Sequence, residues 1–120
     1  MTVVRERASV RRRDGTAVID LPALIDATAD PALADAYTEA ASGGSGPVVL
    51  NFNGVDYINS TGIALIVGVL ARARKDGRAI AATGLSDHSR EIFEVTRLAD
   101  FMTLYESEDS AVGRTGGERA

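Results

Sequence analysis

The sequence lacks cysteine and has a single histidine among its 120 residues. Without cysteine there is no disulfide framework, no thiol nucleophile and no thiolate metal site, which fits a reducing compartment. The formal net charge of -4 gives no overall positive field to attract nucleic acid or anionic lipid. These absences argue against a disulfide-stabilised protein, a thiol-dependent enzyme and a protein that binds nucleic acid or anionic lipid through its overall charge.

Long hydrophobic runs are also missing. The longest one covers residues 63–71, far short of the roughly 20 residues that a membrane span needs. Residues 1–7 carry no apolar stretch of the kind found in a signal peptide. We therefore expect a cytoplasmic protein with no membrane insertion.

The composition is that of an ordinary globular domain, with 45% hydrophobic and 25% charged residues. A chain of this length can bury one core without disulfides or metals. We expect a single domain over residues 1–107. Residues 108–120 are polar and glycine-rich, and this composition predicts a disordered C-terminal tail.

Strand and helix signals alternate along the chain. Asp14-Gly15 predicts a hairpin between two strands, and Asp30-Pro31 predicts a helix start. The expected strands are residues 8–13, 16–21, 48–52, 79–83 and 101–105, and the expected helices are residues 30–41, 60–75 and 88–98. Such alternation implies a largely parallel sheet with helical crossovers.

Hydrophobic spacing predicts which helical side chains face the core. The predicted inward residues are Ile63, Ile66, Val67 and Leu70 in the helix over 60–75, and Ile92, Phe93, Val95 and Ala99 at the helix over 88–98.

Three consecutive arginines, Arg11, Arg12 and Arg13, permit two interpretations. They would suit a nucleic-acid contact, or they would charge an edge strand and so prevent edge-to-edge pairing. The acidic chain and the lack of aromatic partners favour the edge strand.

Catalytic and cofactor signals are weak. Ser86, Asp87 and His88 are adjacent, so their side chains diverge and cannot form a relay, whereas capping of a helix suits them. No His, Cys and carboxylate cluster has metal-ligand spacing, and the glycines of residues 43–46 lack the Lys of a phosphate-binding loop. We expect neither a cofactor nor a metal, and no enzymatic activity.

The most informative segment is Asn59-Ser60-Thr61-Gly62, where a buried strand and a loop lead into an apolar helix. A purely structural interpretation is that Ser60 or Thr61 caps the helix and Gly62 allows tight packing. A functional one is that a phosphate on Ser60 would meet unpaired N–H groups and the positive end of the helix dipole.

Residues 48–52, Val-Val-Leu-Asn-Phe, and residues 56–65, Asp-Tyr-Ile-Asn-Ser-Thr-Gly-Ile-Ala-Leu, resemble the core of the STAS domain of sulphate transporters and anti-sigma factor antagonists. The resemblance covers about residues 8–105. It implies an α/β fold with a central, mixed but mostly parallel sheet, an N-terminal hairpin and helices mainly on one face.

The resemblance also implies a function. Single-domain members of this size are typically bacterial anti-sigma factor antagonists, which bind an anti-sigma factor that is also a serine kinase. The unphosphorylated antagonist binds that partner and so frees the sigma factor for transcription. Phosphorylation of the serine at the position of Ser60 makes the antagonist release the partner. Asn59, Thr61 and Gly62 would contribute to the partner-binding surface, with no direct contact to nucleic acid.

Two positions depart from the family pattern. Asn59 stands where the family most often has Asp, and Pro22 stands where Gly is common. A second hypothesis is a STAS subunit of a membrane transport system, such as a lipid-importing ABC transporter, in which Ser60 and Thr61 form an interface without phosphate. The sequence leaves the oligomeric state open, and a homodimer is compatible with it.

Overall fold

The computed structural model describes residues 8–43 and 46–116, and the remaining residues lie outside this description. The strands are β1 (Ser9–Arg13), β2 (Thr16–Asp20), β3 (Leu24–Ile25), β4 (Val48–Asn51), β5 (Tyr57–Ile58), β6 (Ile80–Thr83) and β7 (Thr103–Tyr105). The α-helices are α1 (Asp30–Ser42), α2 (Ser60–Lys75), α3 (Asp87–Val95) and α4 (Glu108–Gly116). Two 3-10 helices, η1 (Ala27–Ala29) and η2 (Leu98–Phe101), connect them.

The N-terminal hairpin is confirmed. Strands β1 and β2 pair antiparallel, with Arg13 opposite Thr16 across a two-residue turn. Asp14 and Gly15 both have positive φ, 49° and 84°, which is the backbone that a type I′ turn requires.

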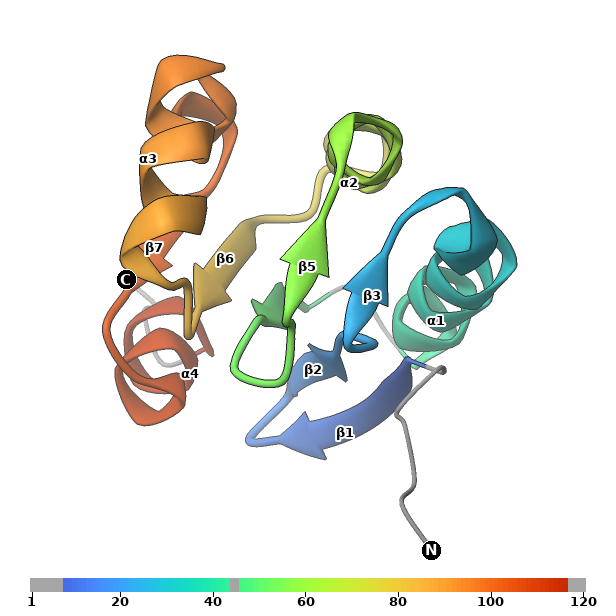
Figure 1. The fold of residues 1–120 in the computed structure, drawn as a ribbon. Helices are drawn as coiled ribbons and strands as arrows, with labels where there is room; N and C mark the ends of the chain where they lie inside the picture. The colour runs from blue at the N-terminus through green and yellow to red at the C-terminus, as the bar shows by residue number, and fades with distance from the viewer. Residues whose placement is uncertain (1–7, 44–45, 117–120) are drawn as a thin grey trace, which may run out of the picture.

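The main sheet has the order β1-β2-β4-β6-β7, and every pair after the hairpin is parallel. Each parallel strand is therefore added beside its predecessor in the same direction. Because crossovers between parallel strands are right-handed, successive steps in one direction place their helices on the same face. Figure 1 shows α1, α2 and α3 together on one side of the sheet.

This face holds the main hydrophobic core. Alternate residues of the central strands, such as Ile19, Leu50 and Ala82, meet the helices there. Tyr37 of α1 and Ile66 of α2 are completely buried against them. The mostly parallel α/β fold with helices mainly on one face is thus the expected one.

The opposite face of the sheet is covered by α4. Ala111 and Val112 of this helix pack against Val18, Val49 and Ala81 in a second, smaller core. The prediction of a disordered tail over 108–120 was therefore wrong for residues 108–116, while residues 117–120 lie outside the described residues. Apolar strand residues that no crossover helix covers supply the driving force for this docking.

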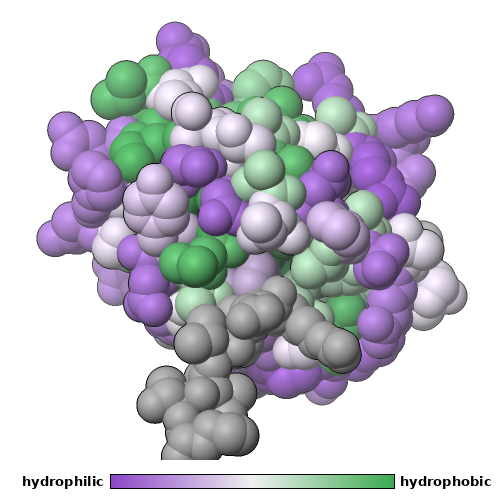
Figure 2. All heavy atoms as spheres, turned by 45° about the vertical axis from the view of Figure 1, so that its right-hand side comes forward, coloured by the Kyte–Doolittle hydropathy of each residue, from purple (hydrophilic) through white to green (hydrophobic). Residues whose placement is uncertain are grey.

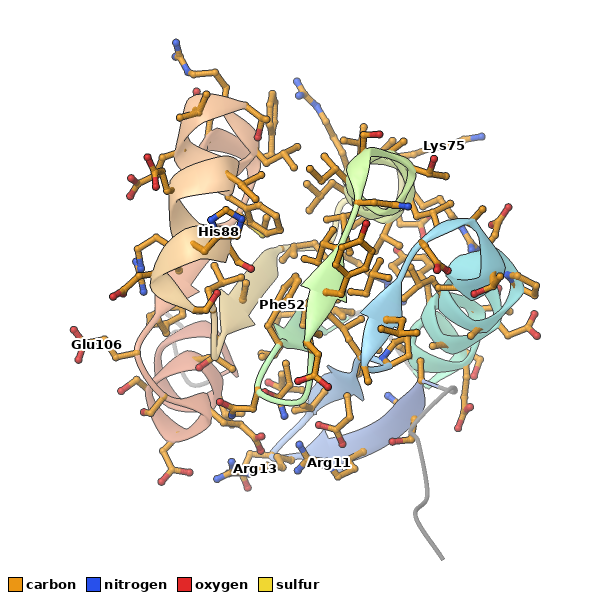
Figure 3. All side chains as sticks on the ribbon, in the orientation of Figure 1. Arg11, Arg13, Phe52, Lys75, His88 and Glu106 are labelled. Carbon is orange, nitrogen blue, oxygen red and sulfur yellow. The ribbon has the colours of Figure 1, made fainter. Side chains whose placement is uncertain are left out.

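Two of the consecutive arginines attach α4 to the hairpin (Figure 3). Arg11 donates to both carboxylate oxygens of Glu108, at 3.0 and 2.7 Å, and also binds Asp20. Arg13 donates to Glu108 at 2.7 Å and to Asp109 at 2.8 Å. The charged edge strand is confirmed, and its charges also join elements that lie 95–97 residues apart in the chain.

Arg12 points to the other face of the hairpin and donates to the backbone carbonyls of Glu39 and Ala40, at 2.9 and 3.3 Å. Carbonyls in the last turn of a helix have no intrahelical donor. The guanidinium of Arg12 therefore supplies hydrogen bonds to two such carbonyls at the C-terminal end of α1. All three arginines therefore have partners within the domain.

Two predicted core positions were wrong. Val67 of α2 is 44% exposed and Val95 of α3 is 76% exposed. In α2 the inward stripe instead includes Val69 and Ala73, because the helix meets the sheet on a face rotated from the predicted one. The helix predicted over 88–98 ends at Val95, and Arg97 adopts a left-handed conformation with φ 67°.

The Glu108 cluster should make stability depend on pH. Hydrogen bonds from Arg11 and then Arg13 hold the pKa of Glu108 below its usual value. A depressed folded-state pKa contributes stability above the unfolded pKa of about 4.3, and this contribution is lost as pH falls through the folded-state pKa. We expect Glu108→Gln to lower the free energy of unfolding by about 1 kcal/mol near neutral pH, and by much less at about pH 3.

Urea denaturation at the two pH values measures this difference. Glu106→Gln is the matched control, because Glu106 is exposed and forms no ion pair with any described residue. Equal effects of the two substitutions near neutral pH would show that the cluster does not hold α4.

Candidate functional site

A short second sheet positions the start of α2. Strand β3 pairs in parallel with β5, with Leu24 beside Tyr57 and Ile25 beside Ile58. The N–H of Asn59 donates to the carbonyl of Ile25 at 3.3 Å, which carries the pairing up to the residue that precedes α2. These two-residue strands were not predicted, because segments so short show no periodicity.

Gly62 lets the first turn of α2 approach β3. It is buried, and a Cβ added to it would overlap the carbonyl oxygen of Ile25. The prediction that Gly62 allows tight packing is therefore confirmed, and the contact is between two backbone segments.

Asn59 caps α2. Its side-chain Oδ1 accepts a hydrogen bond from the N–H of Gly62 at 2.8 Å, and its carbonyl accepts from the N–H of Ile63 at 2.9 Å. The structural interpretation that named Ser60 or Thr61 as the cap was wrong. Asn59 has the extended backbone of a cap residue, whereas Ser60 and Thr61 are already helical.

Ser60 and Thr61 are consequently left at the surface as the first two helical residues. Of the first-turn N–H groups, those of Gly62 and Ile63 have acceptors, while those of Ser60 and Thr61 pair with no other described residue. Both open donors lie at the positive end of a 16-residue helix. The four predicted site residues thus divide into an anchored pair, Asn59 and Gly62, and an exposed pair, Ser60 and Thr61.

Two large apolar side chains are exposed on the short β3–β5 sheet that leads into α2. Leu24 is 45% exposed and Tyr57 is 52% exposed, and they are neighbours across the β3–β5 sheet. The face drawn in Figure 2 mixes hydrophilic residues with smaller hydrophobic patches. The sequence did not predict this pair, because only a loop was expected between the strand over residues 48–52 and the helix over residues 60–75.

The segment around His88 has the predicted structural role. Ser86 caps α3, accepting from the N–H of Ser89 at 3.1 Å, and His88 is exposed. Within residues 8–43 and 46–116 there is no group of His, Cys, Asp or Glu placed to hold a metal ion. Among the helices described, none has the length and apolar character required to cross a bilayer.

Comparison with known proteins decides the family. A family model described as "Mlab, STAS domain" matches residues 8–105. This chain belongs to the STAS domain family. The anti-sigma-B factor antagonist of Staphylococcus aureus strain NCTC 8325 is 30% identical over 82 residues, which are 68% of this chain and 76% of the relative.

Solved STAS structures confirm the fold. The anti-sigma factor antagonist SpoIIAA in its unphosphorylated form matches with a TM-score of 0.71 and 18% identity, covering 92% of this chain and 99% of that one. The Bacillus cell fate determinant SpoIIAA in its phosphorylated form matches with a TM-score of 0.63 and 19% identity, over 89% and 97% of the two chains. At such identities the likeness establishes the shared STAS fold.

The contact at Gly62 should tolerate no side chain. We expect Gly62→Ala to destabilise the domain by about 2 kcal/mol or more, because the new methyl group must push β3 away from α2. Gly68→Ala is a matched control in the same helix, where an added Cβ has no neighbour within 4 Å. This control should raise stability by about 0.5–1 kcal/mol through helix propensity.

Thermal and urea unfolding of both variants tests this expectation. A Gly62→Ala protein as stable as the Gly68→Ala protein would show that the close approach to Ile25 is not required.

The cap at Asn59 should be a measurable part of stability. Asn59→Ala removes the acceptor for the N–H of Gly62, and we expect a loss of about 1 kcal/mol. Asn59→Asp keeps an acceptor and adds a negative charge at the positive helix end, so it should retain the original stability near neutral pH. Urea midpoints of the three proteins compare them, and equal losses for Ala and Asp would contradict a capping role.

Proposed function

We propose that this STAS protein is an anti-sigma factor antagonist whose binding to its anti-sigma factor is switched off by phosphorylation of Ser60. The observation that carries the proposal is the exposed hydroxyl-bearing residue at the N-terminus of α2, in a chain 30% identical to a protein named anti-sigma-B factor antagonist. The proposed role is that of a cytoplasmic binding protein with no catalysis and no direct contact to DNA.

The chemistry of the α2 N-terminus supports a phosphate at Ser60. A phosphoserine carries about 1.5–2 negative charges at neutral pH. The N–H groups of Ser60 and Thr61 are free to donate to it, and the helix dipole favours an anion there. Since the Ser60 side chain is exposed, the modification displaces no core residue.

The surroundings of Ser60 support a docking surface. Leu24 and Tyr57 offer exposed apolar area on the β3–β5 sheet that leads into α2, and Thr61 is exposed beside Ser60. An unmodified serine can be buried against a partner at small cost, whereas a phosphate group there would lose its hydration. Phosphorylation would therefore release a partner that covers this surface.

Asn59 gives the switch a particular electrostatic setting. The amide of Asn59 caps the helix without adding charge next to Ser60. An aspartate cap would repel the incoming phosphate at short range, and the interaction of like charges at such distances is appreciable near a protein surface. The neutral cap would thus favour the phosphorylated form relative to an aspartate at the same position.

The proposed partner is an anti-sigma factor with serine kinase activity. Incubation with the cognate kinase and ATP should add one phosphate, which peptide mass spectrometry should place on Ser60. Ser60→Ala should remain unmodified, and Thr61→Ala, the matched control at the neighbouring exposed position, should still be phosphorylated. Titration calorimetry should show that Ser60→Asp weakens binding of the kinase by at least about tenfold, equivalent to about 1.4 kcal/mol.

Two results would overturn the proposal. One is phosphate on another residue, together with unchanged partner binding by Ser60→Asp. The other is copurification with a membrane permease irrespective of ATP and unaffected by Ser60→Ala, which would favour the transport-subunit hypothesis.

A further inference from the structure

A second exposed apolar area lies along the C-terminal half of α2, away from Ser60. It is a groove of about 520 Å³ between α2, the start of β6 and η2 with the residues that follow it. The lining residues are Val67, Leu70, Ala71, Arg74, Arg78, Ala79, Ile80, Leu98, Asp100, Phe101, Met102 and Thr103.

Buried and exposed hydrophobic residues divide the groove into a floor and walls. Leu70, Ile80 and Met102, each 7% exposed, belong to the core and form the floor. Val67 of α2 at 44% and Phe101 of η2 at 56% exposure form its walls. The exposure of Val67, which the predicted stripe had placed in the core, is thus explained by its position at this groove.

Two arginines and one aspartate give the groove its charge. Arg78 donates to the backbone carbonyls of Gly46 and Ala41, at 2.7 and 2.8 Å, so its guanidinium is held by the domain, whereas Arg74 is exposed.

The guanidinium of Arg74 lies 6.0 Å from the centre of the Phe101 ring, at the outer limit of a cation–π contact. No carboxylate of the described residues lies within ion-pair distance of Arg74. Asp100, the acidic residue of the lining, forms an ion pair with Arg97, and 2.7 Å separates the Arg97 Nε from Oδ2 of Asp100.

We propose that this groove binds a small amphiphilic anion, with an aliphatic chain between Val67 and Phe101 and an anionic head group at Arg74. The apolar floor and walls match an acyl chain, and Arg74 is the cation that complements a carboxylate. The volume lies within the range of about 300–1,000 Å³ that is usual for small-molecule sites. The site is separate from Ser60 and does not depend on the proposed switch.

Octanoate and 1-octanol are suitable probes, because they share the chain and differ in the charge of the head group. Titration of each into ¹⁵N-labelled protein, followed by amide chemical shifts, gives both the affinity and the location of binding. Shifts should concentrate in residues 67–80 and 98–103. Octanoate should bind about fivefold more tightly than octanol, as expected for one partly exposed ionic contact.

Three variants separate the contributions of chain and charge. Arg74→Gln should reduce octanoate binding to the level of octanol and leave octanol binding unchanged. Val67→Glu should abolish binding of octanoate, because it places a carboxylate in the groove. Val95→Glu is the matched control, since Val95 is 76% exposed and does not line the groove, and it should bind both probes normally.

Three outcomes would overturn the proposal. The first is the absence of saturable shifts with either probe. The second is an equal loss of octanoate and octanol binding in Arg74→Gln, which would remove the role of charge. The third is a set of shifts at residues 67–80 and 98–103 that depends on protein concentration without probe, since a second copy of the chain would then cover the groove.

Discussion

The right-handed crossover between parallel strands is the constraint on which the other features of this domain depend. Four parallel strands are added in one direction, so their three connecting helices all fall on one face of the sheet. The opposite face still carries Val18, Val49 and Ala81, which need an apolar cover. Helix α4 provides that cover, and Arg11 and Arg13 hold its acidic first turn at the edge strand.

The same topology brings the start of α2 to the end of the sheet where β4 finishes. There the β3–β5 pair and the close contact of Gly62 with Ile25 fix the helix to the domain by backbone interactions. The cap at Asn59 satisfies one first-turn donor, and exposed residues occupy the next two positions. A precisely held helix end with an accessible hydroxyl is the physical basis of the proposed switch.

Local sequence patterns predicted the parts of this structure that depend on local chemistry. Alternating strands and helices indicated the parallel sheet, and Asp14-Gly15 indicated the hairpin. Helix α4 was missed because its segment is polar and glycine-rich, and its stability comes from partners about 95 residues earlier in the chain. Similarly, the cap was assigned to Ser60 or Thr61 because one residue of shift in the helix start cannot be resolved from composition.

The geometry of α2 also indicates how a phosphate at Ser60 would act. The helix is anchored along its length by Ile66, Val69, Leu70 and Ala73, and its first turn is anchored by Asn59 and Gly62. A phosphate added at the exposed Ser60 hydroxyl touches none of these contacts. It would therefore stabilise the present packing of the domain and an alternative packing to nearly the same extent. Because a ligand or modification shifts a conformational equilibrium only through such a difference, a phosphate here would act by changing surface charge rather than the fold.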